Sequence, residues 1–198
     1  MTTQQGSVGE MIAQSRDVLA NPSVPTFERY ERRGTLSSAA IYVGIAAIVS
    51  GLLGLITSFL PGPPAPGAGG FIGGFISALV QFFVFTGLIF YLGRSFFGGS
   101  GSWDEVAYTF SLFTAPLIVV GAALAFVVSL LVWIPLLGGL VALLGALASI
   151  ALLVVQVYYA YLAVQSSMNI RDPGRSALLL VISFIVTAVV MGLVAWVF

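Results

Sequence analysis

The side chains that could do chemistry gather in one short turn between two long apolar segments. This turn, residues 94–116, contains Arg94, a glycine-rich run and two adjacent carboxylates, Asp104 and Glu105. Two carboxylates can act as acid and base when their surroundings separate their pKa values. The order Ser102-Trp103-Asp104-Glu105 is, however, that of a capping box, and acids at this position suit the positive end of a helix dipole. The pattern therefore favours helix capping and salt bridges to loop arginines over substrate binding.

The residue types that the chain lacks exclude several other chemistries. There is no cysteine and no histidine, so disulfides, thiol or imidazole catalysis, and metal sites built on those ligands are ruled out. The long apolar segments contain no acid or base that could activate a serine or carry a proton across a membrane. We predict no catalytic residue, no cofactor and no metal, and hence a protein that is not an enzyme. Because seven basic residues balance seven acidic ones, we expect no nucleic-acid partner.

Two glutamines and a proline stand out inside the apolar segments. Gln81 and Gln156 fall near the middle of the second and fourth of these segments, and Pro116 lies inside the third. The glutamines could line a polar cavity for a lipid headgroup or a small solute. The alternative, which the sequence favours, is a single hydrogen bond between two helices. The candidate intramembrane polar site is therefore Gln81, Pro116 and Gln156.

The composition indicates an integral membrane protein. Of the 198 residues, 59% are hydrophobic and 7% are charged, whereas a soluble domain carries about 25% charged residues. The mean hydropathy is +1.10. No charge occurs from 34 to 93, from 106 to 170 or from 176 to 198, and such gaps mark segments that lie in lipid. We expect an all-α bundle with approximate spans at 36–60, 71–93, 105–134, 140–165 and 176–198.

The third span should be a broken helix. Pro116 removes one backbone hydrogen bond and collides with the preceding turn, so we expect a kink or break there. Residues 103–115 would then form a half-helix that is either interfacial or re-entrant, with its aromatic side chains near headgroup depth. The sequence leaves these two alternatives open.

The distribution of arginines predicts the orientation. With the amino terminus inside the cell, all seven arginines fall in inner segments and none in outer ones. We therefore place the protein in the cell membrane, with its amino terminus cytoplasmic and its carboxyl terminus outside.

Residues 1–34 form a polar segment without the apolar core of a signal peptide. Ser7-Val8-Gly9-Glu10 fits a capping box, and an amphipathic helix should follow until Asn21-Pro22 stops it. A second short amphipathic piece is expected over 26–33. This cytosolic segment, distinct from the membrane domain 35–198, could dock on a membrane surface or a partner. The alternative, which we favour, is a juxtamembrane anchor that only sets topology.

Three stretches of the chain resemble the YIP family, named after its "Yip one" domain, in the short prokaryotic form. They are Asn21-Pro22 with Phe27, the turn 97–106 continuing to Tyr108 and Pro116, and the run 158–164 leading to Arg175. The resemblance covers about residues 20–198. It implies a five-span membrane protein of unassigned activity and supplies no catalytic residue. Eukaryotic members of the family bind Rab GTPases through longer amino-terminal regions with an Asp-Leu-Tyr-Gly-Pro-type motif, which this chain lacks.

Our leading hypothesis is a non-enzymatic scaffold that organises the membrane or recruits a protein partner. The turn 94–116 and the loop 166–175 hold every charge outside the amino-terminal segment, so they should form one cytosolic face. The rival hypothesis is a lipid-handling protein or small-solute transporter that uses the broken third helix and the two glutamines. Small-residue helix faces also allow a homo-oligomer or an accessory subunit of a larger complex. The candidate interaction face comprises Arg94, Trp103, Asp104, Glu105, Tyr108, Arg171 and Arg175.

Overall fold

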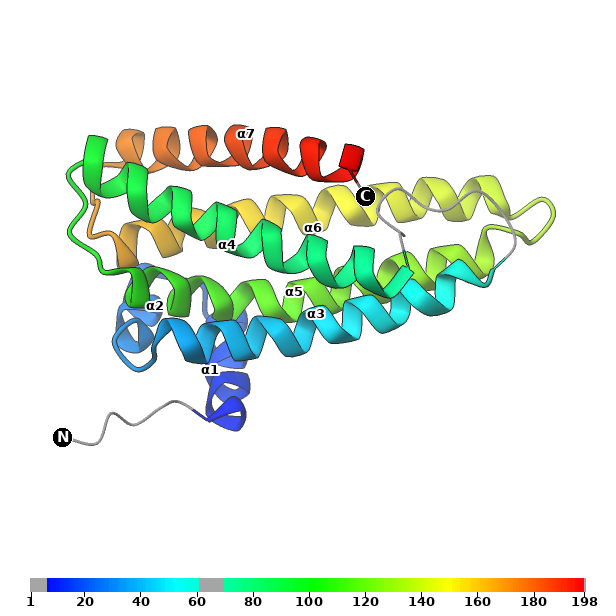
Figure 1. Cartoon of the computed structure of the whole chain (residues 1–198), viewed down its shortest axis with the longest axis horizontal. Coiled ribbons are helices and arrows are strands. Elements are labelled where there is room, and N and C mark those ends of the chain that lie inside the picture. The colour runs from blue at the N-terminus through cyan, green and yellow to red at the C-terminus, as the bar shows by residue number, and fades with distance from the viewer. Residues whose placement is uncertain (1–6, 61–69, 198) are drawn as a thin grey trace.

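The computed structural model describes residues 7–60 and 70–197, and all the secondary structure in these residues is helical (Figure 1). The expected all-α, five-span architecture is confirmed, because α3 to α7 are each long and apolar enough to cross a membrane. Two shorter helices, α1 and α2, precede them. The helices are α1 (Val8–Ala20), α2 (Val24–Tyr30), α3 (Leu36–Ser58), α4 (Gly70–Phe96), α5 (Trp103–Leu131), α6 (Gly138–Ser167) and α7 (Pro173–Val197).

The five long helices form one bundle, with α3, α5 and α7 running one way and α4 and α6 returning (Figure 1). The backbone N–H of Leu36 donates a hydrogen bond of 2.6 Å to Oδ1 of Asp104, so α3 and α5 begin side by side. We call the end where α3, α5 and α7 begin the charged end, because it carries Arg32, Arg94, Asp104, Glu105, Arg171, Asp172 and Arg175.

Helix α5 is the centre of the bundle near the charged end. Residues 106–115 are ten consecutive buried positions, which an α-helix can achieve only when neighbours cover every side. The neighbours are α1, α3, α4 and α6. Because α5 continues without interruption to Leu131, residues 103–115 are not a separate re-entrant half-helix. Because other helices enclose residues 106–115, this segment does not lie on the surface of the bundle.

The prediction that the third span breaks at Pro116 was wrong, whereas the kink that we named as the other outcome stays a prediction. Helix α5 runs without interruption from Trp103 to Leu131, with Pro116 inside it. Proline removes one backbone donor and crowds the preceding turn, and membrane helices tolerate both when neighbouring helices hold the flanking turns. Here the ten enclosed residues before Pro116 provide that support.

The predicted capping boxes and the stop of the first helix are confirmed. Ser7 and Glu10 cap α1 reciprocally, Ser102 and Glu105 do the same for α5, and α1 ends before Asn21. Helix α1 stands at a steep angle to the bundle and packs mainly on α5 (Figure 1). Its buried face is Met11, Ser15 and Val18, spaced for one side of a helix.

Small residues bring α3 and α4 together within the chain. A Cβ added to Gly74 would lie 3.1 Å from Cα of Gly51, and one added to Gly51 would press on the backbone of Phe71. These two glycines therefore serve an internal helix contact. Gly73 has open space around its Cα, so only part of the small-residue face remains for a contact with another chain.

Candidate functional site

Three tyrosines from three different membrane helices hold α1 against the bundle. Tyr108 of α5 donates a hydrogen bond of 2.8 Å to Oε1 of Gln14, and Tyr159 of α6 donates one of 2.8 Å to the carbonyl oxygen of Leu19. The hydroxyls of Tyr42 in α3 and Ser15 in α1 lie 3.0 Å apart. The amino-terminal segment is thus docked on the chain's own bundle, a contact that neither of our interpretations included.

This docking removes Tyr108 from the candidate interaction face. Its side chain is fully buried beneath α1. A Cβ at Gly34 would overlap the ring of Tyr108, so the linker between α2 and α3 also closes over it. The prediction that Tyr108 belongs to an exposed face was wrong, because the amino-terminal segment covers that part of α5.

Asp17 joins the first two helices. Its Oδ2 accepts a hydrogen bond of 2.7 Å from the hydroxyl of Tyr30 and lies 3.1 Å from Nη1 of Arg29. The amide of Asn21 donates to the other carboxylate oxygen at 2.9 Å. The hydrogen bond from Tyr30 is the main reason that the pKa of Asp17 lies below its ordinary value.

A buried carboxylate follows at the end of α2. Glu31 is 5% exposed, and its Oε2 accepts a hydrogen bond of 2.6 Å from Oγ of Ser166 in α6. Burial raises the pKa of Glu31 above its ordinary value. Nε of Arg32 lies 3.7 Å from Glu31 and 3.3 Å from Glu105, so one arginine links the amino-terminal segment to α5.

The two adjacent acids of the turn 94–116, Asp104 and Glu105, both accept hydrogen bonds from backbone N–H groups. Oε2 of Glu105 accepts the backbone N–H of Ser102 at 2.8 Å, and Oγ of Ser102 accepts the N–H of Glu105 at 3.2 Å. Asp104 caps α3 through the N–H of Leu36. Helix capping is therefore confirmed for Glu105, whereas Asp104 caps the neighbouring helix α3 instead of its own. The salt bridge of Glu105 goes to Arg32 rather than to an arginine of the two loops.

The two loops at the charged end lie side by side. The N–H of Ser100 donates to the carbonyl oxygen of Met168 at 3.1 Å, and a Cβ at Gly101 would overlap the carbonyl oxygen of Ser167. Gly98 has φ of +71°, a left-handed conformation that favours glycine and turns the chain toward this contact. The structure thus brings the turn after α4 and the loop before α7 into one surface.

Three arginines on this surface have no ion-pair partner among the described residues. Arg94, Arg171 and Arg175 are all exposed, and within residues 7–60 and 70–197 none of them lies in an ion pair. The guanidinium of Arg94 lies 5.6 Å from the ring centre of Phe90, and that ring packs on Trp103, which is 40% exposed. Asp172 caps its own turn by accepting the N–H of Arg175 at 2.9 Å.

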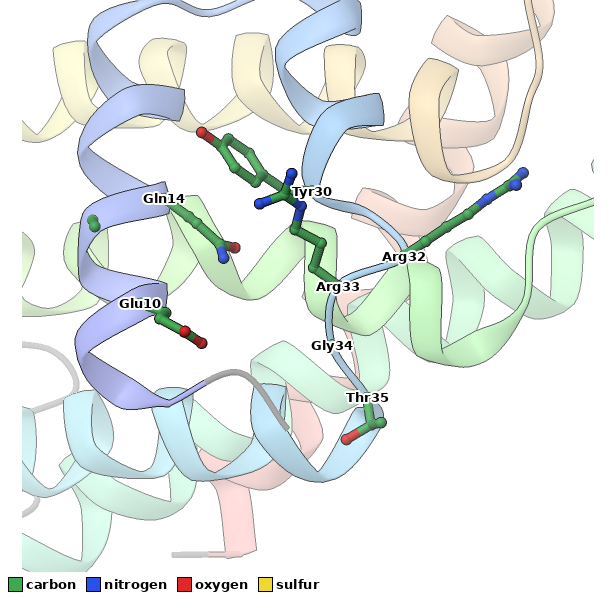
Figure 2. A pocket seen from close by; sticks show the side chains of 8 residues that line it. Glu10, Gln14, Tyr30, Arg32, Arg33, Gly34 and Thr35 are labelled. Atoms are coloured by element: carbon green, nitrogen blue, oxygen red, sulfur yellow. The ribbon is translucent and has the colours of Figure 1, made fainter. Parts of the chain in front are cut away.

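A polar pocket of about 620 Å³ lies between α1 and the linker to α3 (Figure 2). Glu10 and Gln14 line one wall, and Tyr30 and Arg33 line the other. Figure 2 shows Arg33 turned toward Tyr30, whose ring centre lies 5.4 Å away, while Arg32 points out of the pocket. Sequence reasoning did not identify this pocket, because its walls come from two segments that meet only when α1 docks.

A second cavity, of about 400 Å³, lies between α4, α5, α6 and α7 and is open to the surface of the bundle. It contains two of the three residues of the predicted intramembrane site, Gln81 from α4 and Gln156 from α6. Pro116 is not among its lining residues. In the described part of the chain no hydrogen bond joins the two glutamines, so they share a cavity rather than a direct contact.

Most of this chain matches one known protein family. The family model of the Yip1 domain matches residues 16–194. The chain belongs to the Yip1 domain family. The matched region begins within α1 and ends in α7, so it covers the end of α1, the whole of α2 to α6, and α7 up to residue 194. Comparison with curated proteins and with solved structures gave no match.

Proposed function

We propose that this integral membrane protein is a non-enzymatic scaffold that recruits a protein partner through its charged end. The carrying observation is that Arg94, Arg171 and Arg175 are exposed and without ion pairs, whereas the neighbouring carboxylates already serve as caps. Such a surface suits an acidic segment of a partner, because complementary charge gives specificity and a fast encounter. The exposed aromatic ring of Trp103 adds the kind of side chain that anchors interfaces.

The proposal includes an orientation. With the charged end in the cytoplasm, the carboxyl terminus lies outside and the protein sits in the cell membrane. The arginine distribution supports this placement, since every arginine belongs to α1, α2, the linker between α2 and α3, or the charged end.

A pull-down from native nanodiscs tests the proposal. The triple variant Arg94→Gln/Arg171→Gln/Arg175→Gln removes the three charges, and Arg16→Gln on the exposed face of α1 is the matched control. We expect a stoichiometric partner to be lost with the triple variant and with rising salt, and to be kept by the control. A topology assay on each variant checks that orientation is unchanged. Retention of the same partner by the triple variant would overturn the proposal.

The rival hypothesis, a lipid-handling protein or small-solute transporter, loses one of its two supports. It depended on a discontinuous third helix, and α5 is continuous. The cavity that Gln81 and Gln156 line remains as its other support.

A further inference from the structure

The intramembrane cavity has neutral polar groups that the protein itself leaves unused. In the described residues Gln81 and Gln156 make no side-chain hydrogen bond, and the hydroxyl of Thr114, also on the cavity wall, makes none either. In contrast, Thr86 and Thr187 donate to carbonyl oxygens of their own helices at 2.7 Å each. Polar groups in an apolar medium gain from a partner, so the three unused groups favour a ligand that carries one.

The remaining wall is apolar and partly aromatic. Phe82, Phe85, Phe113 and Phe184 contribute to it, and no charged residue does. A few polar groups within a mainly apolar cavity of several hundred Å³ are typical of sites for small molecules. A charged ligand would lie here without a counter-charge, which is costly at membrane depth.

The cavity is not enclosed, because lining residues of α4, α6 and α7 are exposed. Helix α7 packs mainly on α4 and only lightly on α6. Val157 of α6 and Val181 and Phe184 of α7 line the cavity and are exposed. Gln81 of α4 is exposed as well, so the cavity is open to the surroundings of these apolar helices. Since these helices cross a membrane, the medium in front of the opening is lipid.

The depth of the glutamines excludes an ordinary headgroup. Gln156 lies eleven residues before the end of α6, and Gln81 lies fifteen before the end of α4. At 1.5 Å per residue these positions are about 16 and 22 Å from the charged end. A molecule that satisfies them must therefore carry its polar group into the hydrocarbon region.

We propose that this cavity binds one uncharged lipid, an acyl or isoprenoid chain with a hydroxyl or carbonyl group that hydrogen-bonds to Gln81 and Gln156. The lipid enters from the bilayer between α6 and α7. This site is separate from the charged end, so it does not depend on partner recruitment.

Photolabelling in liposomes tests this site. The probe is a hexadecanol with a diazirine in its chain, with unlabelled hexadecanol as competitor and a diazirine phosphatidylcholine of the same chain length as the comparison. We expect competed labelling of Leu153, Val157 and Phe184 by the alcohol. The variant Gln81→Leu/Gln156→Leu should reduce it about tenfold, the effect of losing two hydrogen bonds. Gln165→Leu, which changes a glutamine of α6 outside the cavity, should label like the unchanged protein.

A second variant gives an independent readout. Val157→Trp narrows the opening from an exposed position, so folding should be preserved, and competed labelling should disappear. Labelling that is spread evenly over the lipid-facing helices, that resists competition, or that survives in both variants would overturn the proposal. Equal or stronger labelling of the cavity by the phosphatidylcholine would overturn it too. The triple arginine variant should label normally, so failure of one proposal leaves the other standing.

Discussion

Oγ of Ser166 donates a hydrogen bond of 2.6 Å to the buried carboxylate of Glu31, which lies 135 positions earlier in the chain. This contact fastens the end of α2 to the end of α6, beside the surface that we assign to a partner. Together with Arg32, which bridges Glu31 and Glu105, it makes the docked amino-terminal segment part of the charged end.

The stability of the protein should depend on the ionisation of Glu31. Because burial raises its pKa above the ordinary value of 4.5, the folded state holds this proton more tightly than the unfolded state. Stability should therefore fall as pH rises from about 4.5 through the folded-state pKa, and level off above it. Glu31→Gln should remove this dependence. Thermal unfolding midpoints of the purified protein and variant between pH 4 and 7 give the test, and an unchanged pH profile in the variant would refute it.

Removing one tyrosine hydroxyl should loosen α1. Tyr108→Phe deletes the hydrogen bond to Gln14 and should cost about 1 kcal/mol of stability. Trypsin should then cleave faster after Arg16, since cleavage within α1 requires local opening. The control is Tyr158→Phe, because Tyr158 is exposed. This variant should leave the cleavage rate unchanged. Equal rates in both variants would show that the hydroxyl of Tyr108 does not hold the helix.

Adding a single methyl group at the contact between the two loops should lower the stability of the protein. Gly101→Ala places a Cβ on the carbonyl oxygen of Ser167, so the loops must separate, and we expect a loss of about 1–3 kcal/mol. Gly44→Ala is the control, because a Cβ there meets nothing within 4 Å. Thermal unfolding of both variants distinguishes the two positions. Tolerance of alanine at 101 would mean that the loops do not form one surface.

The continuity of α5 predicts a mild effect of replacing its proline. Pro116→Ala restores one backbone donor in a helix that is already formed, so the thermal midpoint should stay the same or rise. Partner capture and photolabelling should be unchanged. A loss of both, with the fold intact, would indicate that a break at Pro116 has a role after all.

The five spans could be predicted because hydropathy and the stretches without charge are properties of the sequence itself. The capping boxes could be predicted because each joins residues only three positions apart. The docking of α1 could not, since its contacts join residues 27, 94 and 140 positions apart. The enclosure of residues 106–115 of α5 could not be predicted either, because a helix that faces lipid and one that faces other helices are equally apolar. Buried tyrosines usually need a polar partner, so Tyr42 and Tyr159 inside apolar runs were the available signal.

Site-specific photocrosslinking in cells tests the central claim of partner recruitment most directly. A benzophenone amino acid is placed at position 94 or 171, with position 16 as the control. We predict a covalent adduct with one particular protein from positions 94 and 171, absent from position 16 and weakened by Arg175→Gln. Adducts with lipid alone, or with a second copy of this chain alone, would contradict recruitment of a partner by the charged end.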